Sequence, residues 1–114
     1  MDISPIREGL VKITLNGRLD TPGVDRVEAR FLASLVPDGN SAIVDLSHVG
    51  FVSSLGIRMI VSAAKSLRTQ KATLAVYGVQ ERVNQVFEIV SLGQVISICS
   101  TESEALAAVA PALG

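Results

Sequence analysis

The sequence predicts a single α/β domain over residues 1–114. The expected core is a mixed β-sheet that joins an N-terminal hairpin to parallel βαβ units, with helices packed mainly on one face. Two observations support this prediction. Strand-like and helix-like segments alternate through the last two thirds of the chain, as they do in right-handed βαβ units. The 114 residues, 48% of them hydrophobic, can bury one core but leave no room for a second domain.

The first third of the chain predicts a hairpin followed by a helix. Two β-rich runs, residues 3–7 and 10–15, flank the turn-forming pair Glu8-Gly9, and apolar and polar residues alternate in the second run. Residues 17–22 are expected to break this strand. Asp20 or Thr21 then begins a helix that runs to about residue 35, because the following Pro22 is tolerated in a first helical turn.

The middle of the chain predicts a central strand, a loop and a long helix. Residues 41–46 are apolar without strict alternation, which indicates a strand covered on both faces. A loop is expected from His48 to Ser54, and a helix from Ser54 to about residue 69. Beyond it we expect a strand at 73–77, a helix at 81–90, a strand at 95–99 and a closing helix that starts with the capping-box spacing of Thr101 and Glu104.

Composition excludes several classes of function. The formal net charge is −1, so no global attraction to nucleic acid or an anionic membrane is expected. With His48 as the only histidine and Cys99 as the only cysteine, we expect no internal disulfide, no metal site and no catalytic residue. No cofactor is expected either, since the chain lacks a phosphate-cradling glycine loop. The N-terminus has no targeting signal and no segment approaches the roughly 20 apolar residues of a membrane helix, so a cytoplasmic location is expected.

Two serines at the expected start of the long helix are the best candidates for a functional site. The first amides of a helix lack partners within the helix and lie at the positive end of its dipole. Ser53 and Ser54 therefore lie where a side-chain hydroxyl, or a phosphate attached to it, would be stabilised. The alternative is a purely structural N-cap worth about 1 kcal/mol.

Three local patterns and the order of elements resemble the STAS domain, the fold of bacterial anti-sigma-factor antagonists. The resemblance covers nearly the whole chain. The patterns are Gly17-Arg18-Leu19-Asp20 after the second strand, Ile43-Val44-Asp45-Leu46-Ser47 with Phe51-Val52-Ser53-Ser54-Leu55-Gly56 as the central strand and phosphorylation loop, and Ser103-Glu104-Ala105-Leu106 in the terminal helix.

The resemblance implies a switch without an active site of its own. In that family a serine at the start of the second helix is phosphorylated by the partner, an anti-sigma factor with a histidine-kinase-like ATPase fold, and the modified protein releases it. The matching residue is Ser54, with the adjacent Ser53 as the alternative. A serine phosphatase is a further possible partner. Direct nucleic-acid or membrane contact is not implied. The predicted contact residues are Asp20, Ser53, Ser54, Leu55, Gly56, Ile57, Arg58 and Met59.

The chain departs from the commonest family loop, Asp-Ser-Ser-Gly. Ser53 occupies the aspartate position and Leu55 that of the second serine, while Ser54 and Gly56 remain in register. Family members with a small residue in place of the aspartate and an arginine where Arg58 lies also occur. Two structural alternatives stay open, because Asp20 is also explained as a helix cap and Gly56 as a packing contact.

A second hypothesis is a ligand-sensing or scaffold module that uses the same fold without phosphorylation. The chain contains only four aromatic residues, which does not favour a deep ligand pocket. An enzyme is the least favoured class, because the sequence has one histidine, no recognisable pair of carboxylates and no nucleophile elbow.

Overall fold

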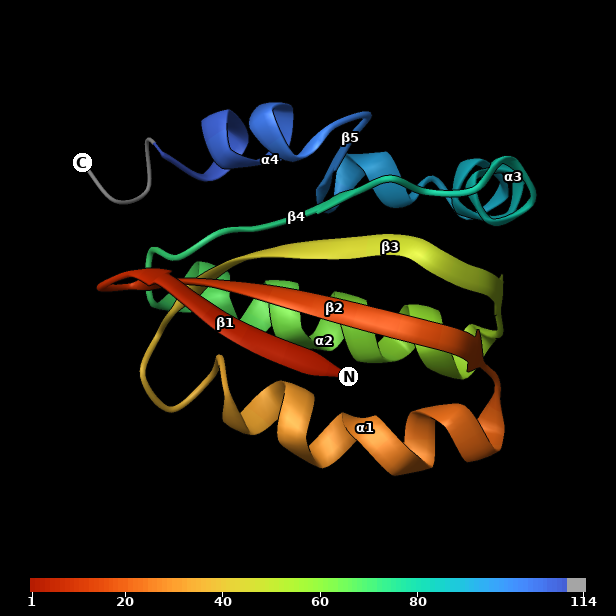
Figure 1. Cartoon of the computed structure of the whole chain (residues 1–114), viewed down its shortest axis with the longest axis horizontal. Coiled ribbons are helices and arrows are strands. Elements are labelled where there is room, and N and C mark those ends of the chain that lie inside the picture. The colour runs from red at the N-terminus through yellow and green to blue at the C-terminus, as the bar shows by residue number, and fades with distance from the viewer. Residues whose placement is uncertain (111–114) are drawn as a thin grey trace.

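The computed structural model describes residues 1–110, which form a five-stranded sheet in the order β1-β2-β3-β4-β5 (Figure 1). β1 pairs with β2 in antiparallel fashion and the other neighbouring strands are parallel, so the predicted mixed α/β sheet is confirmed. The elements are β1 (Asp2–Arg7), β2 (Leu10–Leu19), α1 (Thr21–Ala33), β3 (Ser41–Val52), α2 (Ser54–Thr69), β4 (Leu74–Tyr77), α3 (Glu81–Ile89), the 3₁₀ helix η1 (Leu92–Gln94), β5 (Ser97–Cys99) and α4 (Glu102–Val109).

Two strands are longer than the sequence predicts. β2 continues through the expected break at Gly17 to Leu19, and β3 continues through the expected loop to Val52. The pairing of these two strands shifts register between Thr14 and Asn16 and again between Gly17 and Arg18. Such irregularities let a sheet ladder continue past glycine and polar residues that look like loop in the sequence. The predicted loop from residue 48 to 54 is therefore wrong, since only Ser53 separates β3 from α2.

Other boundaries agree closely with prediction. α2 starts at Ser54 and ends at Thr69 as expected, because its apolar positions recur at helical spacing. α4 is capped by Thr101, whose side chain accepts a hydrogen bond from the backbone N–H of Glu104 at 3.2 Å. β5 is shorter than expected because the backbone N–H groups of Val95 and Ile96 both donate to the Leu92 carbonyl, at 2.9 and 3.1 Å, and so belong to the turn that follows η1.

Helices cover the two faces of the sheet unequally. α1 and α2 lie on one side and α4 on the other (Figure 1). Side chains of α1, α2 and α3 pack into one large apolar cluster with β2, β3 and β4, whereas α4 packs into a second, smaller cluster. The expectation that helices pack mainly on one face is therefore confirmed. The smaller cluster contains Leu10, Ile43, Ala75, Tyr77, Ala105 and Val109.

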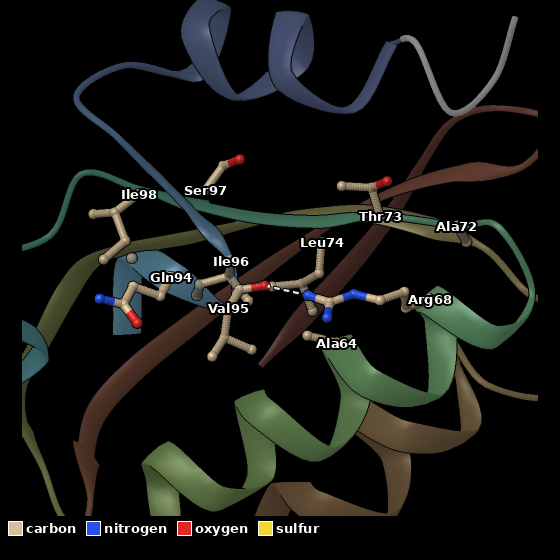
Figure 2. A pocket seen from close by; sticks show the side chains of 11 residues that line it. Ala64, Arg68, Ala72, Thr73, Leu74, Gln94, Val95, Ile96, Ser97 and Ile98 are labelled. Atoms are coloured by element: carbon tan, nitrogen blue, oxygen red, sulfur yellow. Dashed lines mark hydrogen bonds between the residues drawn. The ribbon is translucent and has the colours of Figure 1, made fainter. Parts of the chain in front are cut away.

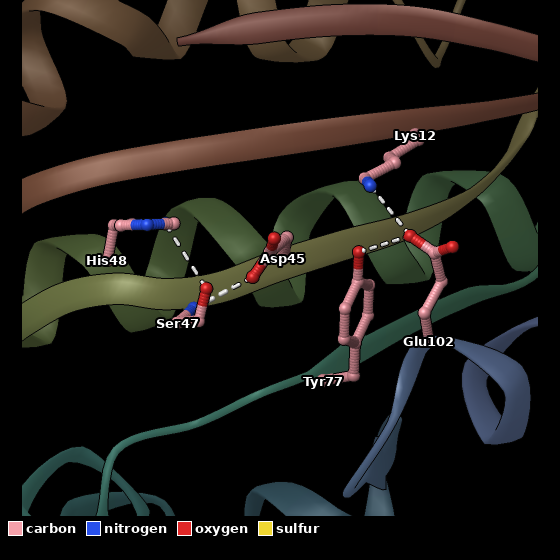
Figure 3. A network of polar contacts seen from close by, with 6 residues as sticks. All are labelled: Lys12, Asp45, Ser47, His48, Tyr77 and Glu102. Carbon is pink, nitrogen blue, oxygen red and sulfur yellow. Dashed lines mark hydrogen bonds and ion pairs between the residues drawn. The ribbon is translucent and has the colours of Figure 1, made fainter.

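A polar contact holds α4 against the sheet (Figure 3). Lys12 on β2 forms an ion pair of 2.6 Å with the Glu102 carboxylate at the start of α4, and the Tyr77 hydroxyl on β4 donates to the same oxygen at 2.9 Å. Burial, followed by the hydrogen bond to Glu102, raises the pKa of Tyr77 to about 12. This contact fixes α4 on the face opposite to α1 and α2.

Candidate functional site

Two helices begin side by side at the same edge of the sheet. β2 and β3 run parallel, with Leu19 opposite Val52 at their carboxyl ends, and each strand leads into a helix after a single residue. The junctions are also joined directly, since Ser53 donates its backbone N–H to the Leu19 carbonyl at 2.9 Å. The topology thus brings Asp20 and the serine pair, which lie more than 30 residues apart in the chain, to one place.

Ser53 is the N-cap of α2. Its Oγ donates a hydrogen bond to the Leu19 carbonyl at 2.8 Å and accepts one from the backbone N–H of Gly56 at 3.4 Å. The side chain is half-buried and its extended backbone is the usual N-cap conformation. The structural N-cap interpretation therefore applies to Ser53, whose hydroxyl is engaged on both its donor and its acceptor side.

Ser54 is the first residue of α2 and its side chain is exposed. The helix starts here, so the first amides of α2 have no carbonyl partner within the helix. The first turn of α2 carries no acidic side chain, and Arg58 follows on the exposed side. The exposed hydroxyl thus lies at the positive end of the α2 dipole without a negative charge on the same turn.

Asp20 is the N-cap of α1. Its carboxylate accepts a hydrogen bond from the backbone N–H of Gly23 at 3.0 Å and pairs with the Arg18 side chain at 3.1 Å. The Gly23 N–H, and after it the Arg18 guanidinium, hold the pKa of the Asp20 carboxyl below its usual value. Asp20 is therefore an anion at neutral pH, and its structural role as a cap is confirmed.

Gly56 and Met59 do not lie on the outer surface. A Cβ on Gly56 would lie 3.0 Å from Leu19 Cβ, from the Leu19 carbonyl oxygen and from a methyl group of Val52, so the close neighbour of this glycine is the chain's own sheet. Met59 is 0% exposed and belongs to the large core cluster, because it follows Gly56 on the inner face of α2. The predicted direct contact of a partner with these two residues is therefore corrected.

The other predicted contact residues of α2 retain access to solvent in different degrees. Arg58 is exposed, whereas Leu55 and Ile57 are half-buried and pack against the large core cluster. The surface at the start of α2 therefore consists of the Ser54 hydroxyl, the Arg58 side chain and the outer parts of two aliphatic side chains.

The sequence interpretation includes Phe51 in the predicted contact loop from residue 48 to 54 but does not single it out. The residue is 37% exposed near the end of β3, and the Arg18 guanidinium carbon lies 4.2 Å from the centroid of its ring. That geometry is a cation–π contact. An aromatic residue three positions before Ser54 was the available signal, but it was assigned to a loop in which its orientation could not be predicted.

A hollow of about 560 Å³ lies at the other end of α2, between the last turns of that helix and the segment leading into β5 (Figure 2). Arg68 crosses it and donates to the Val95 carbonyl at 2.9 Å. Arg68 follows Ser54 by 14 positions, which is about 20 Å along a helix axis. This hollow is thus separate from the site at the helix starts.

Within residues 1–110, no group of three His, Cys, Asp or Glu side chains is placed to hold a metal ion. In the same part of the chain, each helix is too short or too polar to cross a bilayer. His48 is exposed and contacts Ser47, and Cys99 is half-buried as a free thiol.

Comparison with known proteins gives a consistent result. The family model described as STAS domain matches residues 3–105. The chain is 30% identical over 94 residues to a protein of Listeria monocytogenes named anti-sigma-B factor antagonist, covering 82% of each chain. Among solved structures it resembles a STAS domain anti-sigma-factor antagonist from Planctomyces limnophilus, with a TM-score of 0.80, 23% identity and 94% of each chain covered.

A further structural neighbour is the Bacillus cell fate determinant SpoIIAA in its phosphorylated form. The TM-score is 0.70 and the identity 20%, with 93% of this chain and 96% of that chain covered. This likeness shows a shared fold. The family model spans most of the chain, and the chain therefore belongs to the STAS domain family.

Proposed function

We propose that the chain is an anti-sigma-factor antagonist whose binding to an anti-sigma factor kinase is switched off by phosphorylation of Ser54. The single observation that carries this proposal is the difference between the hydroxyls of the two serines. Ser53 uses its hydroxyl to cap α2 and to bind Leu19, whereas the Ser54 side chain is exposed beside it. Names of the curated relatives support the general role of antagonist.

The start of α2 can accept a phosphate without loss of the fold. A phosphoserine adds about −1.5 to −2 charges, which the N-terminal end of a helix dipole stabilises. The cap of α2 does not depend on Ser54, because Ser53 provides it. SpoIIAA, which shares this fold, has been solved in both unphosphorylated and phosphorylated forms.

Phosphorylation would act at the surface. A partner that packs against a neutral hydroxyl loses that contact when the same place holds a dianion and its water, since desolvating the charge is costly. The partner is the kinase itself, and a serine phosphatase would restore the binding-competent form. Asp20, already an anion at the neighbouring helix start, is proposed as a contact for a cationic side chain of the partner.

Capture of the partner from the native lysate is the first test. Unmodified chain should retain a protein with a histidine-kinase-like ATPase fold, and the Ser54→Asp variant should not. Tight binding of a nucleotide or lipid by the chain alone, with no such protein retained, would instead favour the ligand-sensing alternative.

Phosphate transfer is the second test. The purified kinase and ATP should label the parent chain, and Ser54→Ala should abolish the labelling. Ser62→Ala is a matched control, because Ser62 is exposed on the same helix two turns later. Ser53→Ala should still be labelled, which separates the two candidate serines. Labelling of Ser54→Ala at the parental rate would remove Ser54 from the mechanism.

A further inference from the structure

We infer that a small apolar notch next to Phe51 is a second anchor for the anti-sigma factor and receives one apolar side chain of that partner with a carboxylate beside it. This inference rests on the proposed function, because it assigns to the same partner a contact outside the serine pair. The notch is formed by Gly50, Phe51 and Val52 at the end of β3 and by Arg82, Val83 and Val86 of α3.

The size and lining of the notch select the kind of group that fits. Its volume is about 150 Å³. That is below the roughly 300 Å³ at which pockets for cofactors and other small molecules begin, but an apolar cavity of about this volume can hold a benzene-sized group. Apolar side chains of β3 and α3 supply most of the wall. A single leucine- or phenylalanine-sized side chain is therefore the best match.

Phe51 is an exposed aromatic residue at the notch. Phe51 is 37% exposed, and it lies in the exposed last part of β3, between the exposed Gly50 and the buried Val52. One face of the Phe51 ring lies under the Arg18 guanidinium, and Arg18 is in turn fixed by its ion pair with Asp20. The ring is thus held in place before any partner binds, which lowers the entropy cost of using it as an anchor.

The charge around the notch indicates that the partner also places a carboxylate there. Arg82 lines the notch and no acidic side chain does. Arg82 forms no ion pair with any other residue in the range 1–110. A partner carboxylate next to the inserted apolar side chain would pair with this guanidinium in the bidentate geometry that arginine favours.

The notch lies at the end of β3, the strand that leads into the serine site. Val52 lines the notch, and its methyl group lies 3.0 Å from the position that a Cβ of Gly56 would occupy in the first turn of α2. Phe51 precedes Ser54 by only three residues. One partner surface can therefore cover the Ser54 hydroxyl and the notch together.

The test measures binding of the purified kinase, obtained as described above, to variants of the full chain. Arg82→Glu is expected to weaken binding at least tenfold, and Phe51→Ala to a similar extent. Arg26→Glu on α1 and Ile89→Ala at the end of α3 are the matched controls, since both residues are exposed and neither lines the notch. The controls should bind within twofold of the parent. Circular dichroism and light scattering confirm that each variant is folded and report its oligomeric state.

The outcomes separate this inference from the proposed function. If Ser54→Asp abolishes binding while Arg82→Glu and Phe51→Ala bind like the parent, the notch is not an anchor and the phosphorylation switch stands. If none of the three changes affects binding, both proposals fail. If the parent is a dimer that Arg82→Glu dissociates while kinase affinity is unchanged, the notch binds a second copy of the chain, which also overturns the inference.

Discussion

The starts of α1 and α2 have the same construction but different electrostatics. Each follows a parallel strand, and each is capped by a residue in nearly the same extended conformation, with φ −90° at Asp20 and φ −88° at Ser53. Each cap accepts a hydrogen bond from a buried glycine three residues later, Gly23 or Gly56. The difference is charge, because the α1 start already holds a carboxylate, whereas the α2 start holds only a neutral hydroxyl.

This comparison explains why α2 is the better place for a charge switch. A helix N-terminus stabilises one nearby negative group within its first turn. At α1 that group is the Asp20 carboxylate, which also pairs with Arg18. The N-terminal end of α1 therefore has a negative partner at all times. At α2 the corresponding group is absent until a phosphate is added to Ser54. The same local fold thus provides a fixed anion at one helix start and a conditional one at the other.

The largest expected effect on stability comes from adding a methyl group at Gly23, and the same change at Gly56 gives the matched comparison. A Cβ on Gly23 would collide with the backbone carbonyl oxygen of Arg18, whereas one on Gly56 would meet its neighbours at 3.0 Å. We expect Gly23→Ala to lower the free energy of unfolding by about 3 kcal/mol and Gly56→Ala by about 1 kcal/mol. Urea denaturation measures both values. A larger loss at Gly56 than at Gly23 would show that the two starts are not packed as described.

A smaller effect is expected from removing each cap. Ser53→Ala loses both the cap and the hydrogen bond to the Leu19 carbonyl, so we expect a loss of about 2 kcal/mol. Asp20→Ala should lose less than Ser53→Ala, because only the cap and a partly exposed ion pair are removed. Ser54→Ala is the control and should unfold within about 0.5 kcal/mol of the parent. A Ser54→Ala variant as unstable as Ser53→Ala would assign the capping role to the wrong serine.

The smallest effect is a difference in acid sensitivity. The pKa of Asp20 is lower in the folded chain than its ordinary value of 3.8, so the folded state binds fewer protons than the unfolded state in this range. The resulting stability is present above pH 3.8 and is lost as the pH falls through the lowered pKa. Asp20→Asn keeps a good cap without the charge, and its stability should fall less between pH 5 and acid than that of the parent. Identical acid profiles would contradict the ionic role of Asp20.

The two helix starts could largely be predicted from the sequence, but the strand ends that lead into them could not. The helix start at Ser54 follows from local residue preferences and was predicted, and a cap at Asp20 was one of the alternatives that the sequence left open. The extension of β2 and β3 to the helix starts depends on pairing between strands that are distant in the chain, with two register shifts, and local patterns do not encode it. The prediction therefore placed residues 48–52 in a loop.

The errors at the site have the same origin. Leu19 at the end of β2 leaves little room for a side chain at position 56. Sequence spacing does not reveal this contact between β2 and α2. Met59 was assigned to the surface although it shares the inner face of α2 with Ala63 and Leu67, a pattern that helical spacing could have shown. The notch between β3 and α3 depends on tertiary packing and had no local signal.

The most direct test of the account is the affinity of the purified kinase for chain that carries phosphoserine at position 54, introduced during synthesis. Chain with phosphoserine at position 103 is the control, since Ser103 is exposed on α4 on the opposite face of the sheet. We expect the first form to remain folded and to bind at least 100-fold more weakly than unmodified chain, which corresponds to about 2.7 kcal/mol, and the control to bind normally. Equal affinity of the unmodified and Ser54-phosphorylated chains would contradict the account.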